Sequence, residues 1–136
     1  MLNYSWLIIL IVLLFAACSK NTKYAAIVNV SDKIQLSGME TGQNIADSSE
    51  SLRGIFKKVF EYEPEDCNCE KQGELSFFKN GNIILSTVYS EDKDCVFLIV
   101  NDEGRRKCFP LTYQAGMYIS ETLYNLKKSN DKNKYR

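Results

Sequence analysis

The chain has 136 residues, in which 17 Lys and Arg side chains balance 17 Asp and Glu, with five cysteines and no histidine. The absence of histidine excludes Ser-His-Asp and Cys-His nucleophilic catalysis, histidine-liganded metal sites and a histidine pH switch. The zero net charge argues against nucleic acid as a partner, because contact with phosphates requires a basic surface.

The first 17 residues carry no charged side chain and form an apolar leader. Its unbroken apolar run from Leu7 to Ala17 is about 11 residues long, whereas a membrane-spanning helix needs roughly 20 and a signal-peptide core roughly 7–15. Length therefore favours a signal peptide over residues 1–17. Ordinary cleavage after Ala17 would place Phe15 where signal peptidase requires a small residue, so Cys18 needs a separate explanation.

The sequence Phe-Ala-Ala-Cys, which ends at Cys18, resembles the lipobox of bacterial lipoproteins. The resemblance covers residues 1–18 and implies that Cys18 becomes the lipidated first residue of the mature chain. Several acyl chains, at about 0.8 kcal/mol per buried CH₂, would anchor it stably. Because Ser19 and not aspartate follows the cysteine, the resemblance implies the periplasmic face of the outer membrane in a host that has one. An uncleaved membrane anchor and a plain secreted protein are the alternatives.

Residues 18–23 are expected to form the lipidated cysteine and a short polar tether. The five residues after Cys18 reach at most about 17 Å, which keeps the domain close to the membrane. A polar turn follows, flanked by Tyr24–Val30 and Ile34–Leu36. This pattern predicts two short strands, which would add an N-terminal hairpin to the core fold. The Gly-containing residues 37–44 are expected to be a loop.

A helix is predicted after Asp47, because apolar residues recur at i, i+3, i+4, i+7 and i+8. Asp47 with Glu50 three residues later is expected to cap its start, and Lys57 and Lys58 suit its end. The apolar stripe is predicted to pack on a sheet and consists of Leu52, Ile55, Phe56, Val59 and Phe60.

Four strands are predicted after residue 74, where the apolar period changes to two. Asn80-Gly81 favours a tight hairpin turn, and Asn101 to Gly104 favours a type I turn with Gly104 in a bulge position. Two successive hairpins predict a four-stranded antiparallel meander over residues 74–78, 83–89, 95–100 and 105–109.

Thr112 is expected to cap a second amphipathic helix that runs to about Lys128. Residues 129–136 are predicted to be a basic disordered tail, with contact to anionic head groups at roughly 1 kcal/mol per basic residue as the alternative. Residues 24–128 should form a single α+β domain, the meander with one helix before and one after it. Tyrosines and phenylalanines are expected to be largely core. The face of the second helix contains Ala115, Tyr118, Ile119, Thr122, Leu123 and Leu126.

Four cysteines remain as disulfide candidates once Cys18 is assigned to lipid, since exported domains oxidise their thiols. A Cys67–Cys69 bond would close a very small ring. Each of these two is therefore expected to pair with Cys95 or Cys108, in an order left open, at about 2–4 kcal/mol per bridge. Such pairing would attach the linker of residues 61–74 to the second hairpin. This linker is acidic, with a net charge of −5.

Other functions for the cysteines and the acidic residues have weaker support in the sequence. A thiol-disulfide exchanger could use Cys67-Asn68-Cys69, but the acidic neighbours disfavour a thiolate there. The cysteine spacing does not match paired zinc knuckles, and the acidic clusters lack the calcium-loop pattern. No metal or cofactor is expected.

We predict a protein that is not an enzyme, since no catalytic constellation is recognisable. The expected function is that of a membrane-anchored extracytoplasmic lipoprotein in the cell envelope, acting as a non-catalytic binding or envelope-structural module. Its expected partners are membrane lipid, through acylated Cys18, and a protein of the envelope, with no nucleic acid. The alternatives are a thiol-disulfide exchange protein and an inhibitor or immunity protein against an envelope-targeting enzyme.

Overall fold

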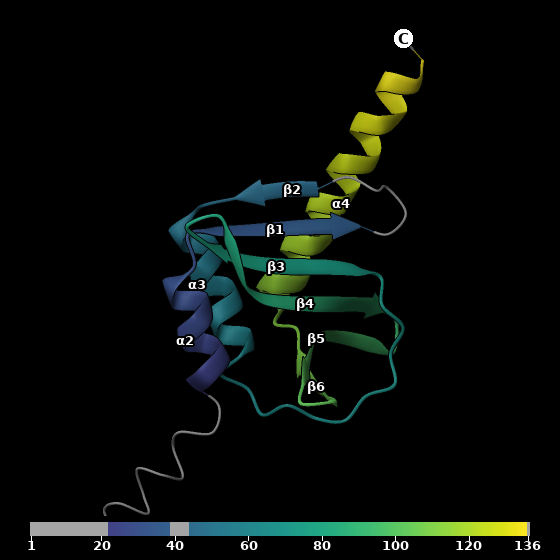
Figure 1. The fold of residues 1–136 in the computed structure, drawn as a ribbon. Helices are drawn as coiled ribbons and strands as arrows, with labels where there is room; N and C mark the ends of the chain where they lie inside the picture. Colours follow the sequence, from purple (N-terminus) through teal and green to yellow (C-terminus); the bar gives the residue numbers. More distant parts are fainter. Residues whose placement is uncertain (1–21, 39–43, 136) are drawn as a thin grey trace, which may run out of the picture.

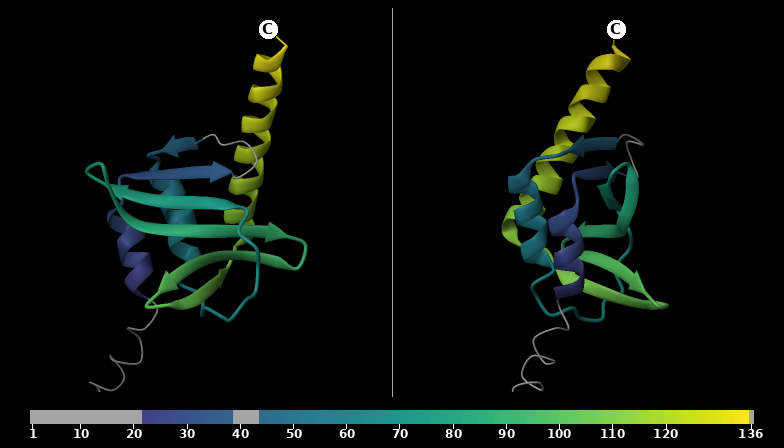
Figure 2. Two further views of the ribbon diagram at one scale, coloured as in Figure 1. Left: turned by 45° about the vertical axis from the view of Figure 1, so that its right-hand side comes forward. Right: turned by 60° about the vertical axis from the view of Figure 1, so that its left-hand side comes forward.

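Three helices cover one face of a six-stranded antiparallel sheet in the computed structural model, which describes residues 22–38 and 44–135 (Figure 1). The strands are hydrogen-bonded in the order β2-β1-β3-β4-β5-β6, and Figure 2 shows the helices gathered on one side of them. The fold class is α+β, as predicted. The elements in chain order are α2 (Thr22–Val30), β1 (Lys33–Gly38), β2 (Asn44–Asp47), α3 (Glu50–Val59), β3 (Gly73–Lys79), β4 (Asn82–Asp92), β5 (Cys95–Asp102), β6 (Arg105–Pro110) and α4 (Tyr113–Lys134).

The N-terminal hairpin predicted from two short strands is wrong in its first half. Tyr24–Val30 belongs to helix α2, which buries Tyr24, Ala25 and Val28 against the core. The second half, Ile34–Leu36, lies in β1 as predicted, but β1 pairs with β2 and β3. A run of seven mostly apolar residues has no period that distinguishes a buried helix from a strand. Its helical conformation therefore follows from tertiary packing.

Strands β3 to β6 form the predicted meander. Asn80 and Gly81 both have positive φ, at 52° and 79°, as a two-residue hairpin turn requires. The β5–β6 turn differs from the prediction, because Glu103 and Gly104 also have positive φ, at 50° and 78°. It is therefore a two-residue turn and not a type I turn with a bulge.

Helix α3 places its apolar stripe as predicted, but its cap is a different residue. Ser49 is the N-cap, and its hydroxyl accepts a hydrogen bond from the Leu52 N–H at 3.2 Å. Asp47 instead accepts a hydrogen bond from the Ser49 N–H at 2.8 Å. Of the stripe, Leu52, Phe56, Val59 and Phe60 are buried and Ile55 is partly buried.

Helix α4 begins as predicted and ends later. Thr112 is its N-cap, with the hydroxyl accepting a hydrogen bond from the Ala115 N–H at 3.2 Å. The helix continues to Lys134, so most of the segment expected to be a disordered tail is helical. No residue from 127 to 135 is buried, and this distal part projects past the sheet (Figure 1). The sheet-facing side buries Ala115, Ile119, Thr122 and Leu126.

The core lies between the helix layer and one face of the sheet, and aromatic rings fill its centre. Phe60 meets Phe109 edge-on with ring centroids 5.0 Å apart, and Tyr24 meets Phe109 at 5.7 Å. Phe56 and Phe77 make a further edge-on pair at 6.1 Å. Such pairs contribute about 0.5–1.5 kcal/mol each beyond the area that they bury, and they join α2, α3, β3 and β6.

Gly73 allows a tyrosine ring to cross the sheet. It lies opposite Tyr89 in the β3–β4 ladder, and Tyr89 is fully buried with its hydroxyl donating to the Ser37 carbonyl at 3.3 Å. Burial, with the Glu91 carboxylate adding to it, raises the pKa of Tyr89 to about 12. A Cβ atom at position 73 would overlap the Tyr89 ring and the Ser37 carbonyl oxygen. Glycine is thus required here by close approach.

Gly73→Ala is predicted to lower the free energy of unfolding by about 1–3 kcal/mol, the usual effect of overpacking. Gly54→Ala is the matched control, because Gly54 lies in α3 with open space where a Cβ would be. That control should be stabilising by up to about 1 kcal/mol through helix propensity. Denaturant unfolding measures both, and a Gly73→Ala protein as stable as the wild type would contradict the packing.

Candidate functional site

Residues 61–72, which we call the strap, cross the face of the sheet that the helices leave open. Leu98 and Phe109 point into the helix-side core, so the alternating neighbours Ile99 and Cys108 point to the other face. Ile99 and Cys108 are nevertheless buried, together with Cys69 of the strap. The strap is therefore the cover for the β4–β6 part of this face.

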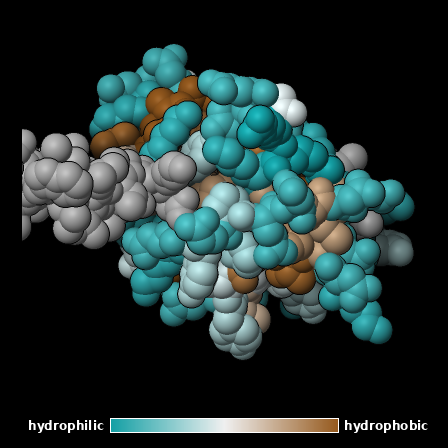
Figure 3. All heavy atoms as spheres, turned by 90° about the horizontal axis from the view of Figure 1, so that it is seen from below, coloured by the Kyte–Doolittle hydropathy of each residue, from teal (hydrophilic) through white to brown (hydrophobic). Residues whose placement is uncertain are grey.

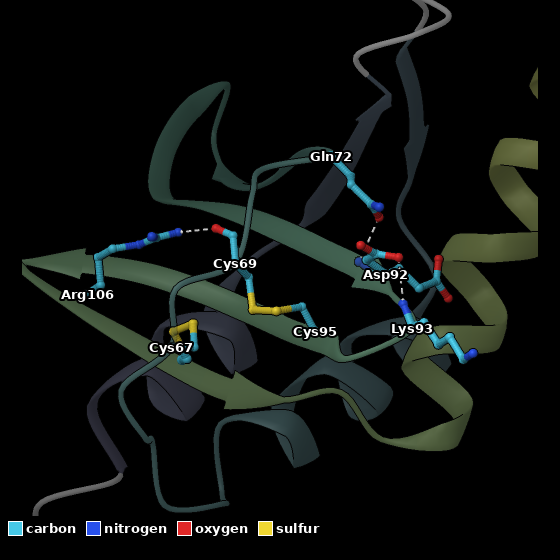
Figure 4. Close-up of a disulfide and its surroundings, with 9 residues drawn as sticks. Cys67, Cys69, Gln72, Asp92, Lys93, Cys95 and Arg106 are labelled. Atoms are coloured by element: carbon cyan, nitrogen blue, oxygen red, sulfur yellow. Dashed lines mark hydrogen bonds between the residues drawn. A yellow bond between two sulfur atoms is a disulfide. The ribbon is translucent and has the colours of Figure 1, made fainter.

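Two disulfides hold the strap in place (Figure 4). Cys67 is bonded to Cys108 and Cys69 to Cys95, with Cα–Cα distances of 6.0 and 5.7 Å. The sequence-based expectation that the two strap cysteines pair with the two hairpin cysteines is confirmed, and the open connectivity is now assigned. Val88 and Phe97 pack against the same cluster.

Backbone and side-chain hydrogen bonds also attach the strap to the sheet. Glu65 and Cys108 exchange both backbone hydrogen bonds, at 2.8 and 3.0 Å, which pairs the otherwise open edge of β6. The Arg106 guanidinium donates to the Cys69 carbonyl at 2.8 Å (Figure 4). Gln72 completes the attachment, since its N–H donates to the Tyr89 carbonyl and its side-chain oxygen accepts from the Glu91 N–H.

The strap presents its carboxylates to solvent. It holds five acidic residues against one lysine, Lys71, which pairs with Glu74 just beyond the strap. The hydrophobic and disulfide side faces the sheet, so the strap is a negatively charged covering attached to the sheet and not a free loop. Its exposed acidic residues are Glu61, Glu63, Glu65, Asp66 and Glu70.

The geometry limits what the cysteines can do. Cys67 and Cys69 are not bonded to each other, and Cys69 is only 5% exposed. Disulfide sulfurs are not the thiolate ligands that zinc requires, so the four-cysteine zinc alternative is wrong. Within residues 22–38 and 44–135, no group of three or more metal-ligating side chains could hold an ion.

The start of α2 is attached to the tip of the β5–β6 hairpin. The buried Tyr24 hydroxyl donates to the Asp102 carboxylate at 2.5 Å, and the Lys107 ammonium donates to the same oxygen at 3.2 Å. These two hydrogen bonds, Tyr24 first, hold the pKa of Asp102 below its ordinary value. Burial, and then the hydrogen bond to Asp102, raises the pKa of Tyr24. Lys23 adds a longer ion pair to Asp102 at 3.8 Å.

Two of these features had little or no signal in the sequence. Tyr24 and Asp102 are 78 residues apart, and no local pattern links them. The exposure of Tyr62, Tyr113, Tyr124 and Tyr135 departs from the expectation that the tyrosines are largely core. For Tyr113 and Tyr124, the spacing opposite the buried stripe of α4 is the usable signal. Cys18 lies outside the described residues.

Comparisons with known proteins give no further guide. No family model matches the chain, and neither a curated protein sequence nor a solved structure matches it. In the part of the chain that the structure describes, no helix has the length and apolar character to span a bilayer. Function must therefore be inferred from the residues and geometry of this chain.

Paired cysteine variants test the disulfide assignment. Cys67→Ser with Cys108→Ser should remove one bridge, lower the free energy of unfolding by about 2–4 kcal/mol, and leave no free thiol from the remaining pair. The mismatched control, Cys67→Ser with Cys95→Ser, leaves two cysteines without their partners and should release two further thiols. Thiol titration under denaturing conditions distinguishes them, and the reverse counts would contradict the connectivity.

Proposed function

We propose that this protein is a membrane-anchored extracytoplasmic lipoprotein that acts as a non-catalytic binding or structural module of the cell envelope. The observation that carries the proposal is the apolar leader ending in Phe-Ala-Ala-Cys, immediately before the folded domain. Acylation of Cys18 would hold the domain at the periplasmic face of the outer membrane, in a host that has one.

The cysteine pairing supports this proposal. Four of the five cysteines are bonded to one another in two disulfides, which leaves Cys18 without a disulfide partner among them and available for lipid. Disulfides persist in oxidising compartments and are rare in the cytosol. They are therefore compatible with an exported protein.

The proposed anchor would act over a very short distance. Helix α2 begins at Thr22, four residues after Cys18, and four residues reach at most about 14 Å. The Tyr24–Asp102 hydrogen bond then attaches α2 to the β5–β6 hairpin. A lipidated Cys18 would thus hold the whole rigid domain next to the bilayer, where it meets partners in or near the membrane.

A thiol-disulfide exchange role receives no support from the pairing. The Cys-x-Cys ring that would be strained and oxidising is not formed, and each of its cysteines is engaged with the hairpin. Both disulfides lie in a packed cluster with Ile99. We therefore retain the binding or structural role as the proposed one.

Processing of the leader tests the proposal. Cys18→Ser, or treatment of wild-type cells with globomycin, should block maturation and leave a heavier, unlipidated precursor. Ser19→Ala, which keeps Cys18, is the matched control and should mature as the wild type does. Immunoblotting and intact mass measurement report both states, and normal maturation of Cys18→Ser under these conditions would refute a lipid-anchored protein.

A further inference from the structure

Helix α4 has a second, solvent-facing line of large side chains opposite its buried stripe. Tyr113, Met117, Tyr124 and Tyr135 are 81%, 40%, 66% and 90% exposed. Their spacings of four, seven and eleven residues keep all four within a narrow sector of the helix surface. Half of the exposed large hydrophobic residues in the described chain therefore lie along one line of α4 and its C-cap residue, Tyr135.

The distal half of this line is basic. Four lysines, against Glu121 and Asp131, lie within four residues of Tyr124 or Tyr135, and none of them is buried. No residue from 127 to 135 is buried, and a short exposed helix is marginal in water by itself, so a surface that neutralises the lysines would stabilise this part of α4. A shallow hollow on this face is lined by Tyr124, Lys127, Lys128, Asp131, Lys132 and Tyr135.

The carboxylates of the strap and the lysines of distal α4 lie on different sides of the molecule. The strap, with its carboxylates, runs along the end from which α2 starts and over the sheet face away from the helices, whereas α4 points away from that end (Figure 1, Figure 2). Seen from below, the α2 end is mostly hydrophilic, with only separated hydrophobic areas (Figure 3). An anionic bilayer would be repelled by the strap and attracted by distal α4.

We infer that the outward face of α4 lies against the anionic head groups of the bilayer in which the protein is anchored, so that the domain rests on its helix layer. The inference rests on the proposed function. Helix α2 belongs to the same layer, and the tether of at most about 14 Å lets that layer reach the surface. Tyrosine rings favour the head-group level of a membrane, and the lysines meet the lipid phosphates.

A tryptophan reporter tests this orientation. The single tryptophan of the chain, Trp6, lies in the leader, so the mature protein has none and Tyr124→Trp is a unique probe. The lipidated mature protein is reconstituted into vesicles of anionic phospholipid brominated near the head-group end of the acyl chains. Trp fluorescence at position 124 should be quenched at least twofold and shifted to the blue.

Two matched reporters separate this orientation from the others. Glu70→Trp places the probe on the strap, and Arg105→Trp places it at the hairpin tip beside α2. Both should be quenched far less than the probe at position 124. Stronger quenching at position 105 would mean end-on contact, and stronger quenching at position 70 would mean contact through the sheet face, and either result overturns the inference.

Charge variants test the lysines. Replacing Lys127, Lys128 and Lys132 with Gln should abolish the quenching of the position-124 probe. Each lysine strengthens the equilibrium constant of the membrane contact about fivefold, so loss of all three makes the contact roughly a hundred times less populated. The control replaces three exposed lysines off the helix layer and should keep the quenching: Lys71, Lys79 and Lys93. Equal quenching in neutral vesicles would overturn the head-group contact.

Failure of the inference and failure of the proposed function give different results. Intact mass reports lipidation independently, so lipidated protein without quenching at position 124 refutes only the orientation. A mature protein without lipid refutes the proposed function whatever the vesicles show. A blue shift at position 124 that rises with protein concentration in the absence of vesicles would identify a second copy as the occupant and overturn the inference.

Discussion

The strap and its two disulfides are the constraint that closes the face of the sheet left open by the helices. The three helices cover one face of the sheet, and Ile99 and Cys108 are nevertheless almost completely buried on the other. Among the described residues, the strap cysteines Cys67 and Cys69 pack on them from outside the sheet. A domain of this size buries only somewhat more than 60% of its unfolded surface. A core on one side of the sheet therefore gives limited stability, and the cross-links add to it. They also pair the open edge of β6 through Glu65.

Where local pattern and tertiary packing agree, the sequence was sufficient to predict the fold. The stripe of α3 and the Asn80-Gly81 turn follow from helical period and backbone preference, and both are confirmed. The pairing of Cys67 and Cys69 with the second hairpin followed from ring size alone. Its order did not, because strand register and the path of the strap decide which sulfur meets which.

The misassigned elements show what local pattern cannot determine. Tyr24–Val30 has the composition of a strand, but its burial partners are in α3 and the distant hairpin. Asp47 and Ser49 are both good caps, and strand β2, which ends at Asp47, leaves the cap position to Ser49. In α4 the aromatic content suggested core, although spacing places Tyr113 and Tyr124 opposite the buried stripe. Of these outcomes, the helical state of Tyr24–Val30 depends on contacts between segments far apart in the chain.

The disulfides, through the strap, make one face of the sheet part of the folded core. Amide hydrogen exchange, measured on the protein before and after reduction by a thiol, tests it most directly. We expect reduction to make the amides of Glu65 and Cys108 exchange rapidly, while those of Leu75 in β3 and Phe56 in α3 stay protected. Unchanged protection of Glu65 and Cys108 after reduction would contradict it.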